Sequence, residues 1–231
     1  MEAVAIIAAA GVGLRMKSAA RKQYLVLEGI PVLARSVRLF LDHPAFTEII
    51  VVIPPGDDKV VEELLRPYFS LDRLKLVEGG ATRQESVGNG LKAISEETAK
   101  LIAVHDAARP LATPGLLTLL LDSAALWGAA IPVIQLSDTL KEVDDAGFVQ
   151  ATPARGKLRL VQTPQVFKRD LLEKAYQTYQ DAGGKATDDA ALVELLGEPV
   201  ITVPGEQSNF KITLPLDLIL ASLMLKGAGS G

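Results

Sequence analysis

Residues 3–22 read AVAIIAAAGVGLRMKSAARK. Val4–Ile7 form a continuous apolar run, which is typical of a short strand buried on both faces of a parallel sheet. Three alanines, Ala8 to Ala10, and the glycines Gly11 and Gly13 follow, so a ligand can approach the main chain closely and meet unpaired N–H groups. Four cations then follow in quick succession: Arg15, Lys17, Arg21 and Lys22. The stretch therefore predicts a strand that leads into a loop for a polyphosphate.

Two common phosphate-binding motifs are absent from this loop. The dinucleotide-binding fingerprint and the Walker A motif both require a glycine where this chain has Met16. A nicotinamide dehydrogenase is therefore disfavoured. From these residues alone, the alternative to a phosphate site is an ordinary strand-to-helix turn with solvated cations.

Composition excludes several classes of protein. The 231 residues, 48% of them hydrophobic, are enough for one large domain with a buried core. A net charge of -4 argues against a general nucleic-acid-binding protein. The chain has no cysteine and only two histidines, which excludes thiolate zinc sites and leaves little room for a Ser-His-Asp triad. No membrane span and no signal-peptide pattern are evident, so a cytoplasmic protein is expected.

Strands and helices alternate along the first part of the chain. Apolar runs predict further strands at residues 48–53, 74–77, 101–104 and 129–134. Helical patterns lie between and after them, at residues 31–41, 57–65, 83–94 and 114–127. This alternation predicts an α/β fold that is Rossmann-like, with a mostly parallel sheet and helices on both faces. Past residue 158, we expect a return to the sheet, two helices, a strand at 200–203 and a last helix from Pro215 to Leu225.

The alternation is interrupted by a predicted hairpin. Residues 138–143 and 147–152 look like two strands joined by a turn at residues 144–147. Such a hairpin has too little apolar area to be stable alone, so it is expected to lie against something, such as a partner subunit. We therefore expect one domain over residues 1–226, with a protruding β-hairpin arm at about 136–157 that mediates a homodimer, and a flexible tail at 227–231.

Two further loops have the features of ligand sites. Gly79 and Gly80 lead into a helix that Thr82 and Glu85 are spaced to cap, and such a helix N-terminus suits an anion or a polar base. Ser86 could donate a hydrogen bond there. The alternative, a glycine turn with a good cap, explains everything except Arg83.

Asp106 directly follows a buried strand, where an open parallel sheet has its ligand crevice. A carboxylate there suits a metal or a sugar hydroxyl, and Arg109 can pair with phosphate or with Asp106. The alternative is a structural ion pair. We expect His105 to support this loop by a hydrogen bond and His43 to be a polar turn residue.

Seven motifs occur in an order that resembles one family. They are AAAGVGLRM, KQYL at 22–25, VHDAARP at 104–110, DTLK at 138–141, TPQ at 163–165, TDDA at 187–190 and NFKIT at 209–213. In these motifs the chain resembles the 2-C-methyl-D-erythritol 4-phosphate cytidylyltransferases, which are sugar-phosphate nucleotidyltransferases of the non-mevalonate isoprenoid pathway. The resemblance extends from Ala3 to about Leu220.

The resemblance implies an activity and a set of site residues. The family joins CTP to methylerythritol 4-phosphate, a sugar-alcohol phosphate, and releases pyrophosphate with the help of Mg²⁺. It implies that the triphosphate is held and the transition state stabilised by Arg15 and Lys22. Nucleotide contacts are implied for Ala9, Ala10, Gly11, Gly80, Ser86 and Asp106, the last also near the metal. Acceptor contacts are implied for Arg109, Thr139, Arg155, Thr163 and Lys211.

Thr139 and Arg155 look like the residues that reach across the homodimer. The resemblance also implies that Arg155 and Lys211 are catalytic, because they position the acceptor for the reaction. The chemistry suits a chain without a catalytic cysteine or histidine. A phosphate monoester, with a second pKa of about 6, is already largely dianionic near neutral pH. The requirement is for cations that offset charge at phosphorus, which Arg15, Lys22 and Mg²⁺ can supply.

The chain departs from the family pattern at three positions. The family often has proline at Arg21, an acidic residue at Ala81 and an aspartate at Ala154. Ala81 removes a carboxylate that could contact the base. Two alternatives remain open: a ribitol 5-phosphate cytidylyltransferase, which tends to have DAVRP in place of DAARP, and a non-catalytic nucleotide-binding regulator. Joint retention of the site cations and Asp106 speaks against the regulator.

Overall fold

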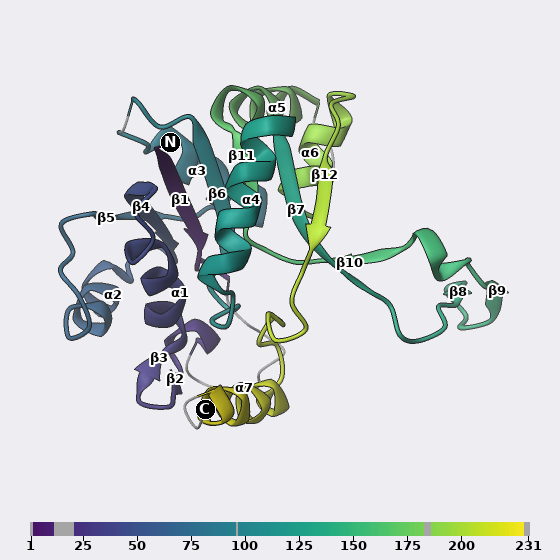
Figure 1. Cartoon of the computed structure of the whole chain (residues 1–231), viewed down its shortest axis with the longest axis horizontal. Coiled ribbons are helices and arrows are strands. Elements are labelled where there is room, and N and C mark those ends of the chain that lie inside the picture. Colours follow the sequence, from purple (N-terminus) through teal and green to yellow (C-terminus); the bar gives the residue numbers. More distant parts are fainter. Residues whose placement is uncertain (1, 12–20, 96, 183–185, 229–231) are drawn as a thin grey trace.

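The computed structural model describes residues 2–11, 21–95, 97–182 and 186–228. It shows a twisted sheet covered by helices on both faces, with an arm that projects from one edge (Figure 1). The C-terminal helix α7 (Pro215–Ala228) lies beyond the ends toward which the central strands point. The predicted α/β architecture with a protruding arm is confirmed.

The sheet has eight strands in the described part of the chain. Four of them are parallel, in the order β5 (Leu74–Glu78), β4 (Phe46–Ile53), β1 (Ala3–Ala8) and β6 (Leu101–Asp106). The strand β11 (Gln165–Lys168) lies between β6 and β7 (Ala129–Gln135) and is antiparallel to both. β7 also pairs in parallel with β12 (Ile201–Pro204) and in antiparallel with β10 (Arg159–Val161). The sheet is therefore mostly parallel with two antiparallel insertions.

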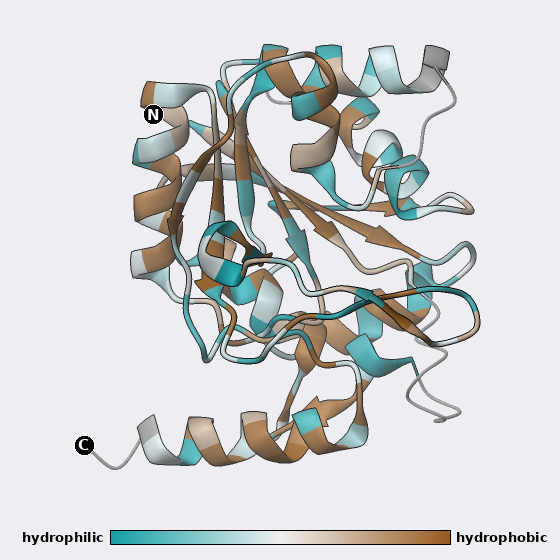
Figure 2. Cartoon of the chain, turned by 90° about the vertical axis from the view of Figure 1, so that its right-hand side faces the viewer, coloured by the Kyte–Doolittle hydropathy of each residue, from teal (hydrophilic) through white to brown (hydrophobic). Residues whose placement is uncertain are grey.

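The central strand β1 is buried on both sides, because alternate side chains enter two different cores. Ala3, Ala5 and Ile7 pack in the core formed with α1 (Val32–Leu41), α2 (Asp58–Leu65) and α4 (Pro114–Trp127). Val4 and Ile6 pack in the opposite core, formed with α3 (Arg83–Lys92), α5 (Arg169–Ala182) and α6 (Asp189–Leu195). Figure 2 shows the resulting hydrophobic strands between the helical layers. This double burial explains why the strand reads as an unbroken apolar run.

Several short elements were not predicted. β11 is only four residues long and is followed at once by α5, so its sequence carries no separate pattern. The hairpin of β2 (Val26–Leu27) and β3 (Ile30–Pro31) and the 3-10 turn η2 (Lys22–Tyr24) are shorter still. Pro31, predicted in the first turn of α1, is the residue that precedes that helix. Local periodicity cannot reveal elements of two to four residues.

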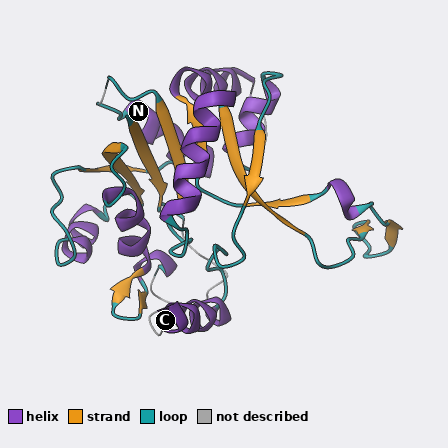
Figure 3. Ribbon diagram, in the orientation of Figure 1, coloured by secondary structure: helices purple, strands orange, loops and turns teal. Residues whose placement is uncertain are grey.

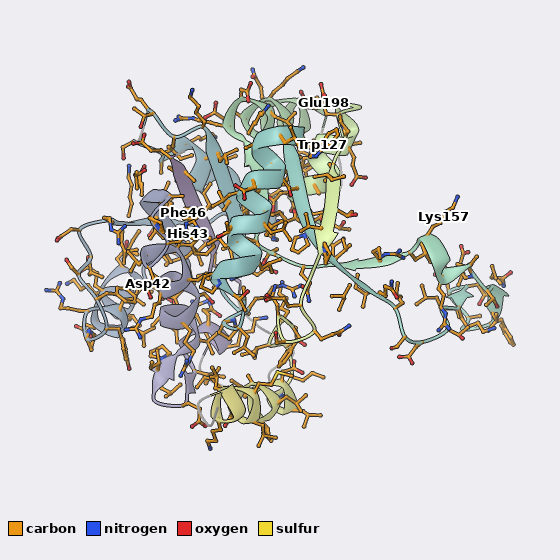
Figure 4. The ribbon with its side chains drawn as sticks, viewed as in Figure 1. Asp42, His43, Phe46, Trp127, Lys157 and Glu198 are labelled. Carbon is orange, nitrogen blue, oxygen red and sulfur yellow. The ribbon has the colours of Figure 1, made fainter. Side chains whose placement is uncertain are left out.

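The arm leaves the sheet after Gln135 and returns at Arg159. Its hairpin strands, β8 (Glu142–Val143) and β9 (Val149–Ala151), are much shorter than predicted, and the turn η3 (Arg155–Lys157) follows them (Figure 3). Figure 4 places Lys157 far out from the sheet and the helical layers. Phe148 is 71% exposed at the tip, so the arm gains little from burial within its own chain.

The last helix corrects the predicted start of the tail. Gly227, expected to begin it, lies in α7, and the remaining predicted tail residues, 229–231, lie outside the described residues. Within the described ranges, no helix combines the length and the apolar character that a membrane crossing would need.

Gly90 lets α3 lie directly on the sheet, and its replacement by alanine is expected to destabilise the fold. An added methyl group would be 2.8 Å from Ile6 Cγ2 and 3.1 Å from Val52 Cγ2, both close to the backbone of central strands. We expect Gly90→Ala to lower the free energy of unfolding by about 1–3 kcal/mol, measured by urea denaturation. Gly227→Ala, a helical glycine with open space around it, is the control and should be neutral or slightly stabilising. Equal effects of the two substitutions would contradict this packing.

Candidate active site

A cleft of about 720 Å³ opens at the carboxyl ends of β1, β4 and β6. This volume lies in the usual range for small-molecule sites. The residues that line it include most of the residues that the sequence assigned to nucleotide and phosphate binding: Ala9, Ala10, Gly11, Lys22, Gly80, Ser86, Asp106 and Lys211. The cleft is therefore the place where several separate motifs meet.

The charge of the cleft favours anions. Among the described residues that line it, four are cations, namely Arg21, Lys22, Arg83 and Lys211, whereas Asp106 alone carries a carboxylate. Two of these cations are paired with carboxylates that do not line the cleft, Arg21 with Asp57 at 3.0 Å and Arg83 with Asp189 at 2.7 Å. The positive excess is therefore smaller than this count, but it is found on a chain whose net charge is -4. Such a focused field attracts a polyphosphate.

The loop after β1 is held by a buried glutamine. Gln23 is 2% exposed, and its Nε2 donates to the carbonyl oxygens of Ala9, at 2.6 Å, and Gly11, at 3.1 Å. Its neighbour Lys22 lines the cleft and donates from Nζ to the Ile212 carbonyl at 2.9 Å. In the KQYL motif, Gln23 thus holds the small-residue loop, and Lys22 places a cation beside that loop. Arg15, the second predicted triphosphate cation, lies outside the described residues.

The glycine pair packs against the first loop. A Cβ atom on Gly79 would lie 2.4 Å from Ala10 Cβ, so only glycine allows this contact. Ser86 Oγ donates to the Thr82 carbonyl at 2.8 Å and accepts from the Gly80 N–H at 3.1 Å. Thr82 caps α3 as predicted, while the Glu85 carboxylate accepts from Ala81. The Ser86 hydroxyl therefore shapes the wall of the cleft.

Asp106 is the ionic centre of the cleft. Its Oδ2 lies 2.7 Å from Lys211 Nζ and 3.8 Å from Arg109 Nε, and its Oδ1 lies 3.4 Å from Arg83 Nε. Burial alone would raise the pKa of this carboxyl, but Lys211 and Arg83 hold the pKa far below its usual value. Asp106 is therefore ionised at any physiological pH.

His105 and Thr163 support Asp106 from behind. The Nε2 of His105 lies 3.1 Å from the Arg109 carbonyl, which can only accept, so Nε2 carries the proton. Nδ1 then accepts from Thr163 Oγ1, which itself accepts from the Asp106 N–H at 3.0 Å. Burial lowers the pKa of His105 to about 4. The expectation that His105 supports the loop is confirmed, and Thr163, predicted to contact the acceptor, lies buried beneath the cleft.

The other predicted acceptor residues lie outside the lining of this cleft. Arg109 donates from Nη1 to the Asn209 carbonyl at 2.7 Å, and its side chain is only 12% exposed. Thr139 and Arg155 lie on the exposed arm, where Arg155 donates to the Ser137 carbonyl. Of the predicted acceptor contacts, the structure thus brings Lys211 alone into the cleft of its own chain.

Sequence reasoning missed the supporting side chains of the site. Gln23, Gln165 and Asn209 are each less than 3% exposed and hydrogen-bonded to other motifs. Gln165 joins TPQ to TDDA by donating to Asp188 and accepting from the Ala190 N–H. Asn209 donates to the Thr163 carbonyl and so joins NFKIT to TPQ. Their presence in short polar motifs was the available signal, but their partners are remote in sequence.

A divalent metal fits this cleft only together with phosphates. No group of three or more histidine, aspartate or glutamate side chains in the described ranges could hold an ion alone. Mg²⁺ is commonly bound by one or two carboxylates together with substrate phosphates, and Asp106 supplies one carboxylate. The residues therefore fit an ion that arrives with a triphosphate.

Comparisons with known proteins agree on one family. The family model for 2-C-methyl-D-erythritol 4-phosphate cytidylyltransferase (IspD) matches residues 3–227. The protein of that name from Desulforamulus reducens is 42% identical over 224 residues, which cover 96% of this chain and 95% of that protein. The 4-diphosphocytidyl-2C-methyl-D-erythritol synthase structure from Anaerococcus prevotii has a TM-score of 0.84 at 33% identity, covering 97% of this chain and 98% of that one. The Thermus thermophilus 2-C-methyl-D-erythritol 4-phosphate cytidylyltransferase structure has a TM-score of 0.79 at 36% identity, covering 98% and 100%.

The buried, neutral His105 should make the ligand-free protein sensitive to acid. In the unfolded chain a histidine binds a proton near pH 6.5, whereas folded His105 does so near pH 4. The unfolded state therefore binds more protons in this window, and stability falls as the pH falls from about 6.5 to 4. We expect this single group to contribute a loss of about 3 kcal/mol in the free energy of unfolding.

Urea denaturation at a series of pH values compares the wild type with His105→Gln. The variant should lose this part of the pH dependence, so that the two stability curves converge toward pH 4. His43→Gln, at a partly exposed histidine, is the control and should change the slope much less. Parallel curves for the wild type and His105→Gln would contradict the neutral buried state.

Proposed function

We propose how this cleft works from one premise: the chain belongs to the 2-C-methyl-D-erythritol 4-phosphate cytidylyltransferase family. It is a nucleotidyltransferase that joins CTP to 2-C-methyl-D-erythritol 4-phosphate and releases pyrophosphate, in the non-mevalonate route to isoprenoids. One observation supports the roles that we assign to individual residues: cations line the cleft around Asp106. We place the reaction in the cytoplasm, where CTP is available.

The reaction requires positive groups that compensate the negative charge of the phosphates more than it requires proton transfer. A phosphate oxygen of the acceptor forms a bond to the α-phosphorus of CTP, and the bond from that phosphorus to the bridging oxygen breaks as pyrophosphate leaves. With a second pKa of about 6, the attacking phosphate needs no general base near neutral pH. The protein must bring two anions together and stabilise the extra charge at phosphorus. This fits a cleft with four cations and with its histidine buried and neutral behind it.

The nucleotide is assigned to the two loops that touch through Gly79. We assign main-chain groups of Ala9, Ala10 and Gly11 to the phosphates, and we place the cytosine at the second loop, where Gly80 lines the cleft. Ser86 acts there by fixing the Gly80 loop, since its own proton is given to Thr82. Asp106 faces the space between the loops and suits a ribose hydroxyl and a bound cation.

Lys22 and Lys211 are assigned to the reacting phosphates. Lys22 lines the cleft next to the Ala9–Gly11 loop, and we place it, with Arg15, on the triphosphate. Mg²⁺, when bound with CTP, would supply further positive charge to the phosphates, and Asp106 is the residue that would hold it. Lys211 also lines the cleft, with its Nζ 2.7 Å from Asp106 Oδ2, and we assign it to the acceptor phosphate.

The acceptor side is completed in our proposal by a second subunit. Thr139 and Arg155 lie on an arm that projects away from the cleft of its own chain (Figure 1). The arm and the adjoining strand β10 expose apolar side chains that would gain burial against another molecule: Val143, Phe148 and Val149 on the arm, and Leu160 and Val161 on β10. We therefore propose a homodimer in which each arm brings Thr139 and Arg155 to the partner's cleft, beside Lys211. Arg109 and Thr163 support the loops beneath that cleft through their hydrogen bonds.

The specificity of the reaction is tested by pyrophosphate release with Mg²⁺ and each of the four ribonucleoside triphosphates. Methylerythritol 4-phosphate and ribitol 5-phosphate are offered in parallel as acceptors. We expect turnover with CTP and methylerythritol 4-phosphate, with other nucleotides at least tenfold slower despite the absence of a carboxylate at Ala81. Preference for ribitol 5-phosphate would overturn the acceptor, and binding of CTP without turnover on either acceptor would indicate a nucleotide-binding regulator.

The proposed sharing of sites is tested by mixing two defective variants. Lys22→Ala should lower turnover about 10²-fold or more, the scale of one lost stabilising contact. Arg155→Ala should weaken the acceptor and leave CTP binding unchanged. A dimer that contains one subunit of each kind has one site with both residues intact, so random co-assembly should restore about a quarter of wild-type activity at low acceptor concentration. Activity no greater than the sum of the two variants alone would show that Arg155 does not serve a partner's site.

A further inference from the structure

Two buried polar side chains behind the cleft have no part in the mechanism described above. Tyr176, on α5, is 4% exposed, and Asp189, the first residue of α6, is fully buried. The Tyr176 hydroxyl donates to Asp189 Oδ1 at 2.6 Å. Burial and the Asp189 carboxylate raise the pKa of Tyr176, so the phenol stays protonated and donates. A fully buried carboxylate is costly unless it is paired and hydrogen-bonded.

The partner of this carboxylate is Arg83, which lines the cleft. Arg83 Nη2 donates to Asp189 Oδ2 at 2.7 Å, and its Nε lies 3.4 Å from Asp106 Oδ1. A continuous polar chain therefore runs from the back of the sheet to the cleft: Tyr176, Asp189, Arg83, Asp106 and Lys211. Two of its links, from Arg83 to Asp189 and from Asp106 to Lys211, join residues more than 100 apart in the sequence.

The distances show which carboxylate holds the guanidinium. Arg83 makes its short contact with Asp189, and the longer one with Asp106, although Asp106 carries the same charge. The guanidinium is planar and rigid, so a fork that is fixed on Asp189 cannot also turn to grip both oxygens of Asp106. Asp106 Oδ2 is thereby left to Lys211. Without Asp189, the nearest carboxylate for Arg83 would be Asp106 itself.

We propose that Asp189 and Tyr176 are positioning residues for nucleotide binding, which act by holding Arg83 on Asp189 so that Asp106 keeps its place toward the ligand. This inference rests on the proposed function, since it assigns Asp106 to the nucleotide. It explains why Asp189, the second aspartate of TDDA, is buried, while the first, Asp188, caps α6.

The test uses Tyr176→Phe and Asp189→Asn, which remove one hydroxyl and one charge with little change of shape. Binding of CTP is measured by calorimetry without acceptor, and KM values for CTP and methylerythritol 4-phosphate are measured separately. We expect CTP to bind about tenfold more weakly to Asp189→Asn and about threefold or more to Tyr176→Phe, the scale of hydrogen bonds to a charged group. KM for the acceptor should stay within twofold. Tyr68→Phe removes a hydroxyl that bonds the Gly29 carbonyl, remote from the cleft, and is the control.

Two outcomes would overturn the proposal. Unchanged CTP binding in both variants, with a lower melting temperature, would show that the chain of contacts only stabilises α6. A loss that appears in KM for the acceptor and spares CTP would place the effect on the wrong substrate. If Asp189→Asn does not fold, Tyr176→Phe decides alone. Binding of CTP by the wild type without pyrophosphate release would instead count against the proposed function, which separates the two failures.

Discussion

The ionised carboxylate of Asp106 is the point on which the cleft depends. Its side chain is 11% exposed, and it is neutralised by cations from three separate segments: Arg83 at the start of α3, Arg109 in the turn after β6, and Lys211 before α7. A buried charge that loses its partner costs several kcal/mol, so each segment is held in place by the same carboxylate. The reverse also holds for Arg109 and Lys211, which lie together around this carboxylate, whereas Arg83 makes its shorter contact with Asp189. The ion pairs around Asp106 therefore also help to hold three segments of the chain together at the ends of the strands.

The layered part of the fold was accessible from the sequence, and the reason is visible in β1 and β6. Their residues are buried on both faces, so an apolar run identifies them directly. The antiparallel strand β11 was not accessible, because its residues resemble a loop between Pro164 and α5 and owe their conformation to β6 and β7. The arm was predicted as a hairpin, yet its strands are short since little of it is buried in this chain.

The site was predicted as a set of motifs rather than as a set of contacts. Lys22, Asp106 and Lys211 line the cleft as expected. Thr163 and Arg109 instead form hydrogen bonds to the backbone of neighbouring loops. Gln23 and Asn209 have no charge and no periodic pattern, so nothing local distinguishes them from surface residues. Their importance comes from carbonyl groups 12 to 46 residues away, which only the folded chain brings within reach. The presence of a short motif is thus better evidence for a particular loop conformation than for a direct contact with a ligand.

The arm begins and ends at neighbouring positions of the sheet, since Gln135 and Arg159 are directly paired across β7 and β10. The segment between them is therefore an insertion into the antiparallel pair of β7 and β10, which could be joined by a short turn instead. Thr139 and Arg155, our proposed acceptor contacts, both lie inside this segment, while Lys22 lies in the turn η2 and Asp106 is the last residue of β6. In our proposal these two acceptor contacts are thus separate in architecture from the nucleotide site, whereas the third, Lys211, lines the same cleft as Lys22 and Asp106. Because the arm is exposed and enters and leaves the sheet at paired residues, its length and sequence can change without repacking the core beneath the cleft.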